Sequence, residues 1–113
     1  MKRRLAGELL RLPVRTRGIA IGRAVDLIVD PAASRAVGFD VHCRDDEHRF
    51  LPWTAATIDD HSISVESPIV MLSEEQLAFY RTRAKSLREL VAVLENVLVE
   101  PDGTFEVVSD DAA

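Results

Sequence analysis

The densest group of side chains able to bind a metal lies between His42 and His48. It holds two histidines, one cysteine and three acids within seven residues, and zinc favours such ligands. His42 and Cys43 are neighbours on an alternating segment, so they face opposite sides of a strand. Cys43 shares the side of Phe39 and Val41. We therefore predict a buried thiol beside a solvated loop, and no metal site.

The carboxylate pairs that could transfer protons are all neighbours in predicted turns: Asp45-Asp46, Asp59-Asp60 and Asp110-Asp111. A general acid needs burial or a like charge in a pocket to shift its pKa, and turn acids are normally solvated. Gly18 and Gly22 precede a strand, so they lack the helix N-terminus that lets a glycine loop bind phosphate. We predict no catalytic residue, no cofactor and no enzymatic activity.

The composition predicts a single globular domain in a reducing compartment. The chain has 113 residues, of which 47% are hydrophobic and 29% are charged, close to the average for one folded domain. Cys43 is the only cysteine, so it cannot form an internal disulfide. No apolar run approaches the roughly 18 residues of a membrane-spanning helix. We expect a cytoplasmic protein without a membrane span.

The charges are distributed unevenly along the chain. Residues 1–23 hold seven of the 14 lysines and arginines against one acid, whereas the remaining residues hold the other seven against 18 acids. An acidic surface repels a phosphate backbone, so nucleic acid is an unlikely ligand except at the basic N-terminus. The competing interpretation of that N-terminus is a solvated start of a strand.

Alternating apolar residues predict several short strands. Val25, Leu27 and Val29 recur at every second position, with Asp26 facing the other way. The same alternation is present in residues 10–14, 36–44 and 63–65, and residues 49–53 are predicted to begin a further strand. Short strands at this spacing predict a small barrel or sandwich, with Gly22 as a bulge or a site of close backbone approach.

From Ser73 the spacing changes to that of a helix. Ser73 and Gln76 match a capping box, and apolar residues then recur every three or four positions in one stripe. The stripe consists of Leu77, Tyr80, Ala84, Leu87, Val91 and Leu94. It could cover the barrel of its own chain or pack on a second copy, and its length favours a homodimer. Residues 101–103 then predict a turn between the two strands of a last hairpin.

The ordered pattern of residues 9–72 resembles the PRC-barrel domain, the small β-barrel of the photosynthetic reaction-centre H subunit and of the ribosome maturation factor. The matching residues include Leu10, Val14, Gly18, Ile21-Gly22, Val25-Asp26, Asp30-Pro31, the strand from Val37 to Val41, Phe50-Leu51-Pro52-Trp53, Asp59-Asp60 and Ile63-Val65. The resemblance implies a barrel that docks to proteins, with no shared active site or cofactor.

We therefore expect a mainly β protein: a PRC-type barrel of five or six short strands, one amphipathic helix and a C-terminal hairpin. The expected units are a basic segment (1–8), the barrel (9–72), the helix (73–96), the hairpin (97–108) and a frayed tail (109–113). The expected function is a non-enzymatic adaptor that binds another protein, with partner-binding candidates Trp53, Phe50, Arg11 and Arg15. The alternative is an accessory factor of RNA metabolism or ribosome assembly that docks a ribosomal protein.

Overall fold

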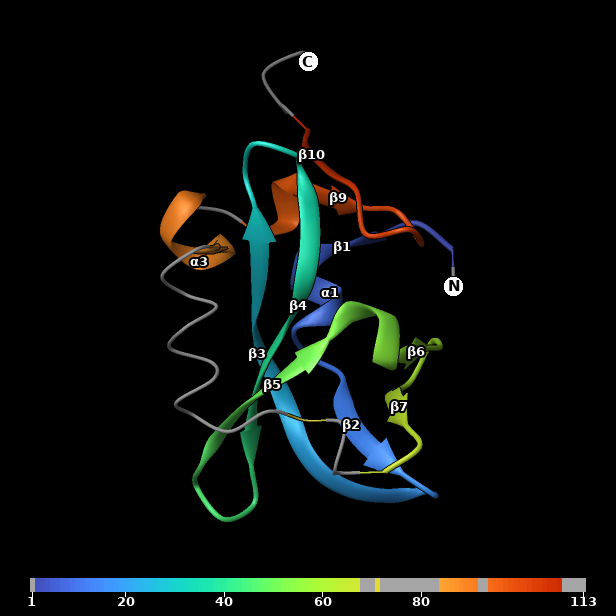
Figure 1. The fold of residues 1–113 in the computed structure, drawn as a ribbon. Coiled ribbons are helices and arrows are strands. Elements are labelled where there is room, and N and C mark those ends of the chain that lie inside the picture. The colour runs from blue at the N-terminus through green and yellow to red at the C-terminus, as the bar shows by residue number, and fades with distance from the viewer. Residues whose placement is uncertain (1, 68–70, 72–83, 92–93, 109–113) are drawn as a thin grey trace.

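The computed structural model describes residues 2–67, 71, 84–91 and 94–108. Its strands form a strongly curled seven-stranded sheet, in the order β5-β4-β3-β2-β7-β6 with β8 also paired to β3, and a three-stranded sheet in the order β1-β9-β10 (Figure 1). The elements are β1 (Arg4–Leu5), α1 (Ala6–Leu9), β2 (Pro13–Thr16), β3 (Ile19–Asp30), β4 (Arg35–Cys43), β5 (His48–Pro52), η1 (Trp53–Ala55), β6 (Thr57–Ile58), β7 (Ile63–Val65), β8 (Lys85–Ser86), α3 (Leu87–Leu90), η3 (Leu94–Asn96), β9 (Val97–Val99) and β10 (Phe105–Val107).

The long antiparallel pair β3–β4 forms the centre of the fold. Leu27 lies opposite Phe39, and Ala24 lies opposite Val41. All four side chains are fully buried on the inner face of the curled sheet. The alternation in the sequence thus predicts the strands and most of their inner face correctly.

Two shifts of register in β3–β4 move two valines off the predicted core face. At the first shift Ala24, not Val25, joins the inner core, and Val25 is half-buried outside it. At the second, Ala36 takes the inner position, while Val37 packs against Ile28 on the outer face. The prediction that both valines belong to the core face is wrong, because a bulge inserts one residue and reverses the alternation around it.

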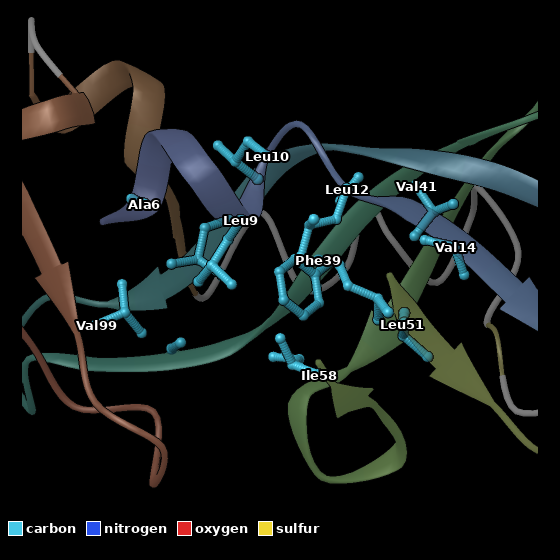
Figure 2. Packing of buried hydrophobic residues seen from close by; sticks show 14 of the residues in the cluster. Ala6, Leu9, Leu10, Leu12, Val14, Phe39, Val41, Leu51, Ile58 and Val99 are labelled. Carbon is cyan, nitrogen blue, oxygen red and sulfur yellow. The ribbon is translucent and has the colours of Figure 1, made fainter. Parts of the chain in front are cut away.

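The main core joins the barrel to segments from both ends of the described chain. Figure 2 shows Leu9 of α1 and Val99 of β9 in the same apolar cluster as Phe39. Leu87 and Val97 belong to this cluster and are fully buried. A core that draws on residues beyond 84 depends on these segments for its stability.

The N-terminal residues are part of the fold. Arg4 and Leu5 pair with β9, and the guanidinium of Arg4 donates a hydrogen bond of 2.6 Å to the carbonyl of Asp59. The strand expected to include Leu10 begins only at Pro13, because Ala6–Leu9 forms a helical turn. Arg4 and Leu5 therefore form a strand that belongs to the folded structure.

The predicted helix 73–96 is not continuous over its described part. Residues 84–91 and 94–96 contain the strand β8, the single helical turn α3 and the short 3-10 helix η3. Lys85 and Ser86 pair with β3 beside Val29 and Ile28, and Val91 is extended. Backbone pairing to β3 replaces the expected helical hydrogen bonds at this point. Residues 73–83, including Leu77 and Tyr80, lie outside the described residues.

The four described residues of the apolar stripe pack on their own barrel. Leu87 is fully buried in the main core, and Ala84 is 5% exposed beside Ile28 and Phe50 on the outer face of the sheet. Val91 and Leu94 are half-buried against the main core. Ala84 and Leu87 are therefore not available as a dimer surface, because the intrachain packing already buries them.

The expected C-terminal hairpin is observed as β9 and β10, with Phe105 opposite Val99. Its turn requires Gly103, which has φ +93°, a region that side-chain-bearing residues rarely adopt. The amide of Ala36 donates a hydrogen bond of 2.7 Å to the carbonyl of Gly103, which fastens the hairpin to the start of β4. The tail at residues 109–113 lies outside the described residues.

Candidate functional site

The residues that resemble a metal cluster are separated by the sheet. Cys43 is 6% exposed on the inner face, whereas His42 projects from the outer face and stacks on His48 with ring centroids 5.0 Å apart. Asp46 lies 3.3 Å from Nε2 of His42, and Asp40 lies 2.8 Å from Nδ1 of His48. Among the residues that the structure describes, no three His, Cys, Asp or Glu side chains gather closely enough to hold a metal ion.

The carboxylates of the turns accept hydrogen bonds that hold them ionised. Arg49 donates bonds of 3.1 and 2.8 Å to Asp45, and with the amide of Glu47 it lowers the pKa of Asp45 from 3.8 to about 2. The amides of His61 and of the next residue lower the pKa of Asp59 in the same way. Both groups stabilise turns, and neither can donate a proton near neutral pH.

Trp53 lies where the barrel meets the C-terminal hairpin. Its ring stacks on Phe39 with centroids 5.4 Å apart and an angle of 24° between the planes. The indole Nε1–H donates a hydrogen bond of 3.3 Å to the carbonyl of Pro101 in the hairpin turn. A Cβ at Gly103 would lie 3.2 Å from Nε1, so the glycine allows the turn to approach the indole closely.

A shallow hollow of about 220 Å³ opens beside Trp53. The residues that line it come from η1, β6 and the hairpin turn: Trp53, Ala56, Thr57, Ile58 and Pro101. Trp53 is half-buried, with one side fixed by Phe39 and the other accessible. A rigid aromatic beside a small, partly apolar hollow can anchor one side chain of a protein partner.

Phe50, a predicted partner-binding residue, does not lie at this surface. It is 1% exposed and packs with Ile28 and Ala84. Its ring covers Gly38, where a Cβ would lie 2.6 Å from a ring carbon. Phe50 is therefore withdrawn as a contact residue, since it belongs to the cluster beneath residues 84–86.

The two predicted arginines are exposed but differ in their surroundings. Arg11 follows α1, and its guanidinium lies 3.8 Å from the carboxylate of Glu95. Arg15 lies on β2 between Ala20 of β3 and Ser64 of β7. Neither residue lines the hollow beside Trp53.

Asp26 was predicted to face outward, but it is 6% exposed. It does face away from the inner core, where residues 86–88 cover it. The hydroxyl of Ser86 donates a short hydrogen bond to its carboxylate, which also accepts the amides of Leu27 at 2.8 Å and Arg88 at 3.4 Å. Asp26 thus provides the acceptor at the N-terminus of α3 that a capping side chain normally supplies.

Two features of the sequence could have revealed this contact. Aspartate is disfavoured inside strands, so Asp26 between apolar neighbours indicates a specific partner. Ser86 and Glu89 have the spacing of a capping box and mark a new helix start inside the predicted one. The apolar stripe continues through these residues and hides the new helix start, because Leu87 fits both the long predicted helix and a short helix that begins after Ser86.

A sequence profile of the PRC-barrel domain matches residues 1–72, which is more than half of the chain. The protein therefore belongs to the PRC-barrel domain family. No curated protein sequence and no solved structure matches the chain significantly. None of the helices in the described part of the chain has the length and apolar character needed to cross a membrane.

Proposed function

We propose that this protein is a non-enzymatic, cytoplasmic adaptor that binds another protein at the hollow beside Trp53. The hollow carries the proposal because it combines a positioned aromatic ring with a lining of mainly apolar residues. Elsewhere in the protein, the turn carboxylates of Asp45 and Asp59 accept hydrogen bonds that stabilise their loops, and they are not arranged for proton transfer. Cys43, a single buried thiol, is compatible with the reducing cytoplasm.

Membership in the PRC-barrel family supports this assignment at the level of the fold alone. The support for Trp53 as a contact residue comes from its immediate surroundings. Aromatic side chains next to small apolar hollows are the commonest anchors of protein interfaces. Because Phe39 and Pro101 already hold the indole, binding a partner would cost little side-chain entropy.

The alternative function, an accessory factor that approaches RNA through its basic N-terminus, has weaker support. Arg3 forms an ion pair of 3.0 Å with Glu100, and Arg11 lies near Glu95. Arg4 is bound to the carbonyl of Asp59. These cations are partly neutralised or used within the chain, so they release fewer counterions on contact with phosphates. RNA binding that weakens steeply with salt would favour this alternative.

We propose that self-association uses β10 and not the apolar stripe. β10 is an end strand of its sheet; Val107 is 59% exposed, and Val108, which follows the strand, is 44% exposed. The amide of Phe105 at the start of β10 already donates to the carbonyl of Ser34, so the open part of the edge is near Val107. An exposed strand edge with apolar side chains can pair with a second copy. Light scattering at micromolar concentration should then give a dimer mass that the variant Val107→Lys reduces to that of a monomer.

The adaptor proposal can be tested by capture of partners from a native extract. Full-length wild type, Trp53→Ala and Ile19→Ala are compared, where Ile19 is an exposed apolar residue (63%) that serves as the matched control. We expect one specific partner to be retained by wild type and by Ile19→Ala, and lost by Trp53→Ala. A Trp53→Ala variant that folds normally by circular dichroism and keeps the same partners would contradict the proposal.

A further inference from the structure

A second hollow lies at the other end of the curled sheet, where β3 begins and β4 ends. Figure 1 shows the β2–β3 and β4–β5 connections at this same end. The hollow has a volume of about 390 Å³. It is lined by Pro13, Ala20, Gly22, Arg23, His42, Cys43, Arg44 and Asp46.

The register of β3 and β4 places Arg23 on the outer face of the sheet, and Arg44 begins the turn that follows β4. Arg23 lies directly opposite His42, and the amide of Arg44 donates to the carbonyl of Ile21, one pair further along. The pair between them, Gly22 and Cys43, faces the inner side. Both arginines are exposed, and both line the hollow.

Neither guanidinium has an intramolecular partner among the described residues. Arg3, Arg11 and Arg49, in contrast, each form an ion pair. The acid nearest to the two arginines along the lining is Asp46, which lies 3.3 Å from Nε2 of His42. Among the described residues, the hollow thus presents two arginines that form no ion pair, together with one acid, Asp46, beside His42.

The chemistry of the hollow fits carboxylates better than a nucleic acid. A guanidinium binds a carboxylate through two parallel hydrogen bonds, and a hollow of about 390 Å³ has room for only one or two side chains. A nucleic-acid backbone gains affinity by contacting a track of several cations that release counterions, whereas the lining of this hollow supplies two arginines.

We propose that Arg23 and Arg44 bind aspartate or glutamate side chains of an acidic segment in the partner protein. This inference rests on the proposed protein-binding function and adds the chemistry of a second contact, separate from the hollow beside Trp53. Charges at such an open site act mainly on the association rate and on selectivity.

The test measures fluorescence anisotropy of the full-length protein with a labelled short peptide of alternating Glu and Gly. A Gln-Gly peptide is the uncharged control ligand. The double variant Arg23→Gln/Arg44→Gln is compared with Arg3→Gln/Lys85→Gln, which removes the same charge outside the hollow. We expect the first variant to weaken binding of the Glu peptide about tenfold and the second less than about twofold.

Equal weakening by both variants would overturn the proposal, because net charge alone would then explain the binding. No weakening by either variant, or equal binding of the Gln peptide, would also overturn it. A single-stranded oligouridylate that binds through the two arginines while the Glu peptide does not would identify a nucleic-acid site instead. The Trp53→Ala variant should still bind the Glu peptide, because Trp53 does not line this hollow. Binding at the two arginines can therefore be judged independently of the partner capture that tests the hollow beside Trp53.

Discussion

The pair β3–β4 and the segment of residues 84–96 both show regular apolar spacing, yet only the first has the conformation that its spacing predicts. In β3–β4, alternation corresponds to two strands with a common inner face. In the described residues 84–91 and 94–96, spacing by three and four corresponds to three short elements whose apolar residues reach the same barrel. Apolar spacing therefore identifies buried residues more reliably than backbone conformation, because burial depends on the surface against which a segment packs.

The two regions are also stabilised differently. β3–β4 is held by continuous backbone pairing and a dense apolar face. Residues 84–91 are held by Leu87 and by a small set of polar contacts, including the bond of 2.6 Å from Nε of Arg88 to the carbonyl of Val25. Substitutions in residues 84–91 should therefore lower the free energy of unfolding by removing a few identifiable contacts.

The largest effect is expected for Gly38→Val, which tests how tightly β4 and β5 pack. A Cβ at Gly38 would lie 2.3 Å from the carbonyl oxygen of Leu51 and 2.6 Å from the Phe50 ring. Because backbone atoms cannot yield, we expect destabilisation of about 3 kcal/mol or more in urea unfolding. Gly7→Ala is the control, since its Cβ meets only the flexible side chain of Glu95. Equal stabilities of the two variants would refute the close packing.

Next in size is Leu87→Ala, which tests whether the stripe packs on its own barrel. Leu87 is fully buried, so we expect a loss of about 3 kcal/mol. Leu90, which is 45% exposed, should tolerate alanine within about 0.5 kcal/mol. Both values come from thermal unfolding at several protein concentrations. A midpoint that rises with concentration only in wild type would instead place Leu87 at an interface between chains.

Asp26→Ala should have a smaller effect, about 2 kcal/mol, because Ser86 and the amide of Arg88 lose a buried acceptor. Ser86→Ala should cost about 1 kcal/mol. If the contact between the two side chains is as direct as observed, the double variant should be less destabilised than the sum of the single variants by about 1 kcal/mol. Additive losses would show that the two side chains do not interact.

The smallest effect concerns the exposed pair Asp45–Arg49. The pKa of Asp45 is lowered from 3.8 to about 2 in the folded state, so its stabilising contribution is present above about pH 4 and is lost as the pH falls toward 2. An NMR titration of the carboxyl group should give this low pKa, and Arg49→Gln should return it toward 3.8. An unshifted pKa in wild type would show that the bidentate contact does not persist in solution.

Local patterns predict much of the fold but little of its long-range pairing. The alternation in β3 and β4 and the turn at Gly103 are local features, and the strands and the hairpin follow from them. The contacts of β1 with β9 and of β8 with β3 join residues far apart in the sequence. The bulges at Val25 and Val37 depend on the opposing strand, which the sequence of one strand does not specify.

The candidate site was predicted in part. Trp53 was a candidate because tryptophan is enriched among interface anchors, although a tryptophan that covers the end of a barrel is the commoner outcome. Its contact with Pro101, and therefore the second wall of the hollow, depends on the hairpin docking against the barrel. Phe50 was misassigned because it lies on the outer face, where burial depends on residues 84–86.

The region that matches the family and the C-terminal segment form one folded unit, and together they build the hollow beside Trp53. We would test this by urea unfolding of a fragment comprising residues 1–72, compared with the full chain. The fragment lacks the buried residues Leu87, Val97 and Val99, so we expect it to show no cooperative transition while the full chain unfolds cooperatively. A fragment that unfolds cooperatively at the same urea midpoint as the full chain would contradict the account.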